Sequence, residues 1–153
     1  MVKRVVVLIG TKKGVFLAQS DAARQDWSLS GPYCDAWPIN HVVGDAQTGT
    51  IYAAGGNAWF GPSVWKSGDL GATWTRSGAG LAYAEGEDAV TSAWSLAKSH
   101  GRLHVGVEPA GLFVSADDGE NFSHVQALRD HPSRATWVPG AGGLILHSIV
   151  THP

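Results

Sequence analysis

The sequence has little of several features that would narrow its function. It holds one cysteine, Cys34, in 153 residues. A disulfide within the chain is therefore excluded, and a single thiol is typical of a reducing compartment. No apolar run approaches the roughly 18 residues of a membrane span, and the run 5–9 is shorter than the roughly 7–15 residues of a signal-peptide core. We therefore expect a cytoplasmic protein that makes no membrane contact.

Charge is also scarce and balanced. Asp, Glu, Lys and Arg make up 16% of the residues, and 11 Lys and Arg against 13 Asp and Glu give a net charge of -2. Because no basic stripe exists, the electrostatic footprint of a nucleic-acid-binding protein is missing. Histidines and cysteines do not occur at the spacing of a zinc site, so we expect no metal and no cofactor.

Turn-forming and aromatic residues are abundant instead. The chain contains 20 glycines and 7 tryptophans. Short runs of β-branched and aromatic residues alternate with Gly, Asp, Asn and Ser, and no segment keeps a 3.6-residue period. This pattern predicts an all-β protein.

One turn motif occurs twice, with the pattern Ser-x-Asp-x-Gly-x-x-aromatic. Ser and Asp side chains can bond the backbone of their own turn, glycine supplies a positive φ, and the aromatic ring can fill the space between strands. A degenerate copy opens the chain at Ser20, Asp21 and Trp27. We expect structural roles for the motif residues, which are Ser67, Asp69, Gly71 and Trp74, then Ser115, Asp117, Gly119 and Phe122.

Short β-rich runs accompany each copy of the motif and predict twelve strands. Four strands in about 50 residues, repeated along the chain, are typical of a propeller blade. The expected strands are 5–9, 15–18, 27–30, 40–43, 50–54, 63–67, 73–77, 92–97, 103–107, 112–115, 121–125 and 144–150. The single domain 1–153 then divides into a first unit at 1–31, a second at 32–78, a third at 79–126, and a loop with the first strand of a next unit at 127–153.

The repeated motif resembles the Asp-box, or BNR, repeat of sialidases and sortilin-type receptors. The whole chain is similar to bacterial proteins labelled sialidase-like or BNR-repeat glycosyl hydrolases, a label that describes the repeat and not a chemistry. The resemblance implies a β-propeller segment of four-stranded antiparallel blades, about three blade-equivalents long. Propellers close with about 4–8 blades. We therefore expect a partial ring, which is either half of a homodimeric six-bladed ring or the N-terminal part of a longer propeller that is inactive alone.

In such a propeller the Asp-boxes lie on one face and the longest loops lie on the other. A mixture of aromatic, acidic and basic groups around a concave mouth suits a carbohydrate or another small polar ligand. The alternative for each residue is an ordinary surface or packing role. The ligand-binding candidates on that face are His41, Asn57, Trp59, Trp94, Glu108, Arg129, His131, Arg134 and His147.

Catalysis is a separate question. A sialidase needs an arginine cluster, and only Arg129 and Arg134 fall on the expected face, so sialidase activity is disfavoured. Another glycoside hydrolase or lyase stays open, because Glu108 with Asp130 or Glu85 would form a carboxylate pair, and His131 is a further catalytic candidate. The competing prediction, which we favour, is a non-catalytic module that binds a ligand or partner.

Overall fold

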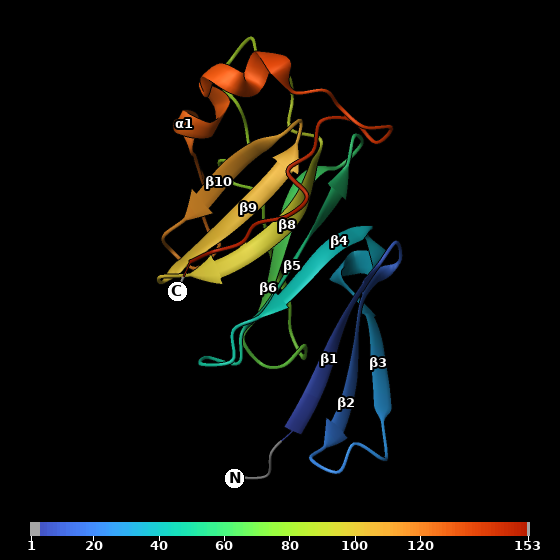
Figure 1. The fold of residues 1–153 in the computed structure, drawn as a ribbon. Coiled ribbons are helices and arrows are strands. Elements are labelled where there is room, and N and C mark those ends of the chain that lie inside the picture. The colour runs from blue at the N-terminus through green and yellow to red at the C-terminus, as the bar shows by residue number, and fades with distance from the viewer. Residues whose placement is uncertain (1–3, 153) are drawn as a thin grey trace.

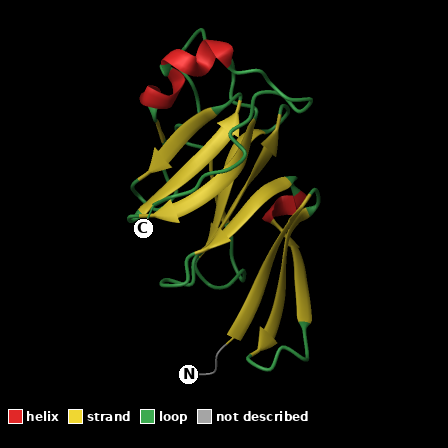
Figure 2. Ribbon diagram, in the orientation of Figure 1, coloured by secondary structure: helices red, strands yellow, loops and turns green. Residues whose placement is uncertain are grey.

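The chain forms three antiparallel sheets, which Figures 1 and 2 show stacked in chain order. The structure is a computed structural model that describes residues 4–152. The first sheet contains β1 (Arg4–Thr11), β2 (Gly14–Asp21) and β3 (Ser28–Tyr33). The second contains β4 (Ile39–Gly44), β5 (Ile51–Asn57), β6 (Gly61–Ser67) and β7 (Thr75–Ser77), and the third contains β8 (Ser92–Ser99), β9 (Arg102–Glu108), β10 (Gly111–Ser115) and β11 (Ser123–His124). The predicted all-β class is confirmed.

The prediction of a twelfth strand at 144–150 is wrong for the described residues, since this segment joins no strand ladder. It lies instead against the third sheet (Figure 1), where the Leu146 N–H donates to the Val107 carbonyl at 3.2 Å. The Ser95 hydroxyl donates to the Leu146 carbonyl at 2.6 Å. A strand requires a parallel or antiparallel neighbour, and none of the described strands forms a ladder with this segment. Residues 1–3 and 153, at the ends of the predicted first and last units, lie outside the described residues.

Two short helical segments interrupt the long loop before that segment. They are α1 (Gln126–Arg129) and the 3-10 helix Pro132–Thr136, and a third short turn, Cys34–Ala36, links the first two sheets. His131 caps the second of these, because its Nδ1 accepts from the Ser133 N–H at 3.2 Å. The loop therefore has a defined local structure that its sequence alone did not indicate.

Two apolar cores hold the sheets together. One joins the first sheet to the second through Val15, Leu17, Ile39, Ile51 and Trp65, and all of these side chains are buried. The other joins the second sheet to the third through buried residues that include Tyr52, Leu96, Val105, Phe113 and Phe122. Each large apolar side chain buried in this way contributes about 1.5–3 kcal/mol. The sheets consequently pack face to face rather than edge to edge.

The two copies of the repeated motif fold into the same turn, which we call the box turns (67–74 and 115–122). In the first, the Ser67 hydroxyl accepts from the Gly71 N–H and donates to Asp69 Oδ1, both at 2.8 Å. Asp69 Oδ1 also accepts from the Thr73 N–H at 2.9 Å. Hydrogen bonds from the Thr73 hydroxyl and N–H lower the pKa of Asp69 to about 2. The predicted bonding of Ser and Asp within their own turn is confirmed.

The second box turn repeats these bonds with Ser115 and Asp117. Gly119 N–H donates to Ser115 Oγ at 2.8 Å, and Asn121 N–H donates to Asp117 Oδ1 at 2.9 Å. Gly71 and Gly119 have φ values of 90° and 94°, a region that disfavours any other residue. The expected positive φ is therefore present in both turns.

The motif aromatics occupy the space between sheets. Trp74 stacks on Tyr33 of the first sheet with ring centroids 5.9 Å apart, and its Nε1 donates to the Gly71 carbonyl at 3.1 Å. Phe122 is buried in the second core. Each box turn thus fixes both its own hairpin and a contact beyond it.

An ion-pair cluster around Asp118 also joins the second and third sheets, at the end that carries the box turns. Asp118 forms ion pairs with Lys66 of β6 and Lys98 of β8, both at 2.7 Å, and accepts a hydrogen bond from the Tyr52 hydroxyl. Hydrogen bonds from Lys66, Lys98 and Tyr52 hold the pKa of Asp118 well below its usual range. Burial and the contact with Asp118 raise the pKa of Tyr52.

Candidate functional site

A cavity of about 340 Å³ opens between the second and third sheets. It lies at the C-terminal ends of β5 and β9. The box turns follow β6 and β10, which run antiparallel to β5 and β9. The cavity and the box turns are therefore at opposite ends of the sheets. Three predicted ligand-binding residues, Asn57, Trp94 and Glu108, line this cavity together. The full lining is Asn40, Gly56, Asn57, Ala58, Thr91, Ser92, Trp94 and Glu108.

The cavity is built on a cross-sheet hydrogen-bond network. Asn40 Nδ2 donates to Ser92 Oγ and to the Ala93 carbonyl, both at 2.9 Å. The Ser92 hydroxyl lies 3.3 Å from the Gly56 carbonyl, to which it donates. These bonds connect β4, β5 and β8, so the walls of the cavity are held at a fixed separation. Sequence reasoning missed Asn40 and Ser92, although Asn40 directly precedes the candidate His41.

Glu108 is the acidic side chain of the cavity lining. Its Oε2 accepts from Trp94 Nε1 at 3.0 Å, while its carbonyl accepts from the Thr91 N–H at 2.8 Å. Oε1 faces Gly143, where an added Cβ would lie 3.2 Å from it. The carboxylate is therefore held by the indole and covered on one side by a glycine backbone.

The β5–β6 turn forms the rim of the cavity. Asn57 Oδ1 accepts from the N–H groups of Trp59 and Phe60 at 2.9 and 3.1 Å, which fixes the turn. Phe60 packs against Trp37 with centroids 4.5 Å apart, while Trp59 is 92% exposed. Ala58, next to Trp59, lines the cavity. A large aromatic surface thus projects into solvent beside the polar cavity.

None of the three candidate histidines lines the cavity. His41 Nδ1 accepts from the Leu96 N–H at 2.9 Å, which ties β4 to β8, and burial lowers the pKa of His41. A ring nitrogen that accepts a backbone N–H carries no proton, so His41 serves the sheet contact as a neutral side chain. His147 lies exposed in the segment 144–150.

The remaining candidates form a second group on α1 and the helical turn after it, above β10 in Figure 1. Arg129 pairs with Glu87 at 2.9 Å and lies 4.1 Å from the Tyr83 ring centroid. Arg134 lies over the Trp137 ring at 5.3 Å. The single cluster expected from the sequence is therefore divided into two.

The other acidic and basic candidates of that region bond locally. His131 Nδ1 lies 2.8 Å from the Ser133 hydroxyl, and Asp130 Oδ1 accepts from Gln126 Nε2 at 3.2 Å. Glu85 is exposed in the loop before β8. Neither Asp130 nor Glu85 belongs to the lining of the cavity that contains Glu108.

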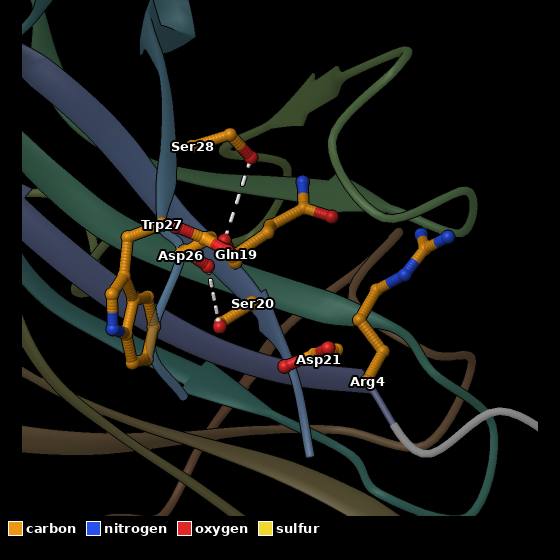
Figure 3. A pocket seen from close by; sticks show the side chains of 7 residues that line it. All are labelled: Arg4, Gln19, Ser20, Asp21, Asp26, Trp27 and Ser28. Carbon is orange, nitrogen blue, oxygen red and sulfur yellow. Dashed lines mark hydrogen bonds between the residues drawn. The ribbon is translucent and has the colours of Figure 1, made fainter. Parts of the chain in front are cut away.

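A second cavity, of about 580 Å³, lies beside the β2–β3 turn of the first sheet. Two of its hydroxyl groups are engaged, as Figure 3 shows: Ser20 Oγ donates to the Asp26 carbonyl at 2.6 Å, and Ser28 Oγ donates to the Gln19 carbonyl at 3.4 Å. Trp27 Nε1 donates to the Arg24 carbonyl at 3.0 Å. This depression is a feature of the β2–β3 turn, and none of the ligand-binding candidates lines it.

Comparison with known proteins gives a simple result. No protein-family model matches the chain, and no curated protein matches it. Across residues 4–152, no three His, Cys, Asp or Glu side chains are grouped to hold a metal ion. In the same range no helix is long and apolar enough to cross a bilayer.

Proposed function

We propose that this chain is an Asp-box β-propeller segment that binds a small, neutral, polyhydroxylated ligand such as a sugar. The binding site is the cavity lined by Asn57, Trp94 and Glu108. The propeller assignment is supported by the stacking of three antiparallel sheets, the second and third of which carry the same box turn at one end. The cavity volume of about 340 Å³ lies within the range of about 300–1,000 Å³ typical of small-molecule sites.

The Glu108–Trp94 pair is the observation that carries this proposal. A carboxylate whose one oxygen is fixed by an indole N–H, at 3.0 Å, is oriented before a ligand arrives. Charge-assisted hydrogen bonds from ligand hydroxyls to such a carboxylate are about twice as strong as neutral ones. No lysine or arginine lines the cavity, so an anionic ligand would meet the Glu108 charge without compensation.

The exposed Trp59 adds the apolar half of the site. A sugar ring presents hydroxyls at its edge and C–H groups on its face, and an aromatic ring packs well against the latter. Trp59 follows Ala58 of the lining, and the Asn57 side chain holds the Trp59 backbone N–H in the turn. The rim therefore offers a stacking surface next to the polar groups.

Binding accounts for the site better than hydrolysis does. Glycoside hydrolases use two carboxyl groups about 5–9.5 Å apart across the scissile bond. Glu108 stands alone in the lining, and its predicted partners Asp130 and Glu85 lie elsewhere. Arg129 is already paired with Glu87, so it is not free to receive the carboxylate of a sialic acid.

The test is a binding titration of the purified chain with glucose, galactose, mannose and N-acetylglucosamine. Ligand-observed NMR and tryptophan fluorescence would report saturation at up to about 50 mM sugar, above the millimolar Kd that a few hydrogen bonds support. We expect at least one sugar to bind. In Glu108→Gln and Trp94→Phe the affinity should fall about tenfold, which is about 1.4 kcal/mol.

Two control variants separate the cavity from the rest of the surface. Glu85→Gln removes an exposed carboxylate outside the lining, and Trp27→Phe alters the second cavity. Both should bind like the original chain. If no sugar gives a saturable signal, or if Glu108→Gln binds unchanged, the proposal is wrong.

A further inference from the structure

The first sheet lacks a strand that the other two possess. β5 pairs with both β4 and β6, and β9 pairs with both β8 and β10. β1 holds the corresponding place but pairs with β2 alone among the described strands. Its free edge presents a row of backbone donors and acceptors, together with Val7, which is 45% exposed. Such an edge is a template for another strand.

The segment 144–150 lies where the first strand of a fourth sheet would lie. β4 packs on β1, and an added Cβ on Gly10 would lie 3.1 Å from the Ile39 and Val42 side chains. Leu146 likewise covers Gly106 of β9, where its carbonyl and side chain leave no room for an added Cβ. The segment therefore stacks on the third sheet as β4 stacks on the first.

Part of the segment 144–150 has backbone groups that can form hydrogen bonds with another strand. In the part of the chain that the structure describes, the backbone of residues 147–150 takes part in no hydrogen bond. The sequence of the segment, rich in Leu, Ile and Val, favours a strand. Its seven positions are one fewer than the 8 residues of β1, which spans Arg4–Thr11.

The free edge of β1 and the segment 144–150 lie apart in the structure. The second sheet stands between the first sheet and the third, and Figure 1 shows β1 and the C-terminal trace on opposite sides of the molecule. A second copy of the chain carries both features in complementary positions.

We propose that two copies of this chain associate by exchanging these strands. Segment 144–150 of each copy pairs with β1 of the other and becomes the missing strand of its first sheet. The arrangement is reciprocal, so a two-fold axis relates the copies and the assembly closes without free edges at these junctions. This inference does not depend on the ligand proposed above, because it concerns other residues and is tested without ligand.

Solution mass is the first test. One chain has a mass of 16.1 kDa, so light scattering coupled to size exclusion should report about twice that mass. Val7→Lys places a charge on the exposed face of the edge strand β1, beside the position of the added strand, and should raise the dimer dissociation constant at least tenfold. The matched control Leu29→Lys alters β3, at the other edge of the same sheet, where Leu29 is 66% exposed, and should stay dimeric. A monomeric original chain, or equal effects of both variants, would overturn the exchange.

Cross-linking tests the pairing itself and does not require Val7→Lys to fold. Cys34 is buried, and burial raises its pKa to about 12, so an introduced cysteine is the reactive thiol. Chains carrying Val7→Cys and chains carrying Ile149→Cys are co-expressed and treated with a short bismaleimide. We expect covalent dimers that join one chain of each type. Absence of this product, or equal product when Leu29→Cys replaces Val7→Cys, refutes the proposed contact.

Discussion

The box-turn serines offer the sharpest test of how this fold is stabilised. Ser67 is 1% exposed, and its hydroxyl is the acceptor for the buried Gly71 N–H at 2.8 Å. Ser67→Ala removes the acceptor and leaves that N–H buried without a partner. An unsatisfied buried donor costs about 1–3 kcal/mol, so the free energy of unfolding should fall by that amount. Ser115→Ala should cost the same, because Ser115 accepts from Gly119 N–H at the same distance.

The two turns belong to different sheets, so their effects should add. Independent sites add within about 0.5 kcal/mol, and the double variant should lose about 2–6 kcal/mol. Urea unfolding followed by tryptophan fluorescence measures these values. Thermal unfolding should show a fall in Tm of about 2–4 °C for each kcal/mol in a chain of this size.

Ser123→Ala provides the matched control. Ser123 is exposed in β11, and its hydroxyl bonds no other described residue, so its removal should change stability by less than about 0.5 kcal/mol. If Ser67→Ala behaves like this control, the Ser67–Gly71 hydrogen bond does not stabilise the fold. If the double variant is no less stable than either single one, the two turns do not act as separate supports.

Three further outcomes follow from groups with altered hydrogen bonding or burial. Tyr52→Phe removes one of three donors to Asp118 and should lower stability by about 0.5–1.5 kcal/mol in the same urea assay. The pKa of Asp69 is lowered to about 2, so its ionised carboxylate stabilises the fold at neutral pH, and this stabilisation is lost as the pH falls from about 4 towards 2. Asp69→Asn should therefore make the urea midpoint less sensitive to pH between about 4 and 2. Cys34, with a pKa raised to about 12 by burial, should not react with a disulfide reagent at about pH 8 until the chain is unfolded in guanidinium, and rapid reaction of the folded protein would contradict its burial.

The parts of the structure that the sequence predicted well are the local ones. Ser67, Asp69 and Gly71 interact within one turn, so their spacing in the chain is enough to indicate the bonds they form. The hairpins follow for the same reason, because each strand pairs with its neighbour in sequence.

The candidate site was harder to predict because it depends on distant contacts. Asn40 bonds Ser92, and the pairing of Arg129 with Glu87 removes that arginine from the expected cluster. Neither contact follows from strand alternation or turn chemistry. The strand expected at 144–150 illustrates the same limit, since a segment with strand-like sequence becomes a strand only when a partner lies beside it.

The fourth position of each box turn links its sheet to another in a different chemical way. Leu70 and Asp118 both adopt positive φ, at 55° and 66°. Leu70 lines a pocket with Val6 and Leu8 of the first sheet, whereas Asp118 receives two lysines and a tyrosine. The residue at this position therefore suits the sheet that each turn contacts. Exchanging the two residues would place a leucine against ammonium groups, or a carboxylate against the side chains of Val6 and Leu8. The fourth position, one of several that differ between the two turns, therefore distinguishes the contacts of the second unit from those of the third.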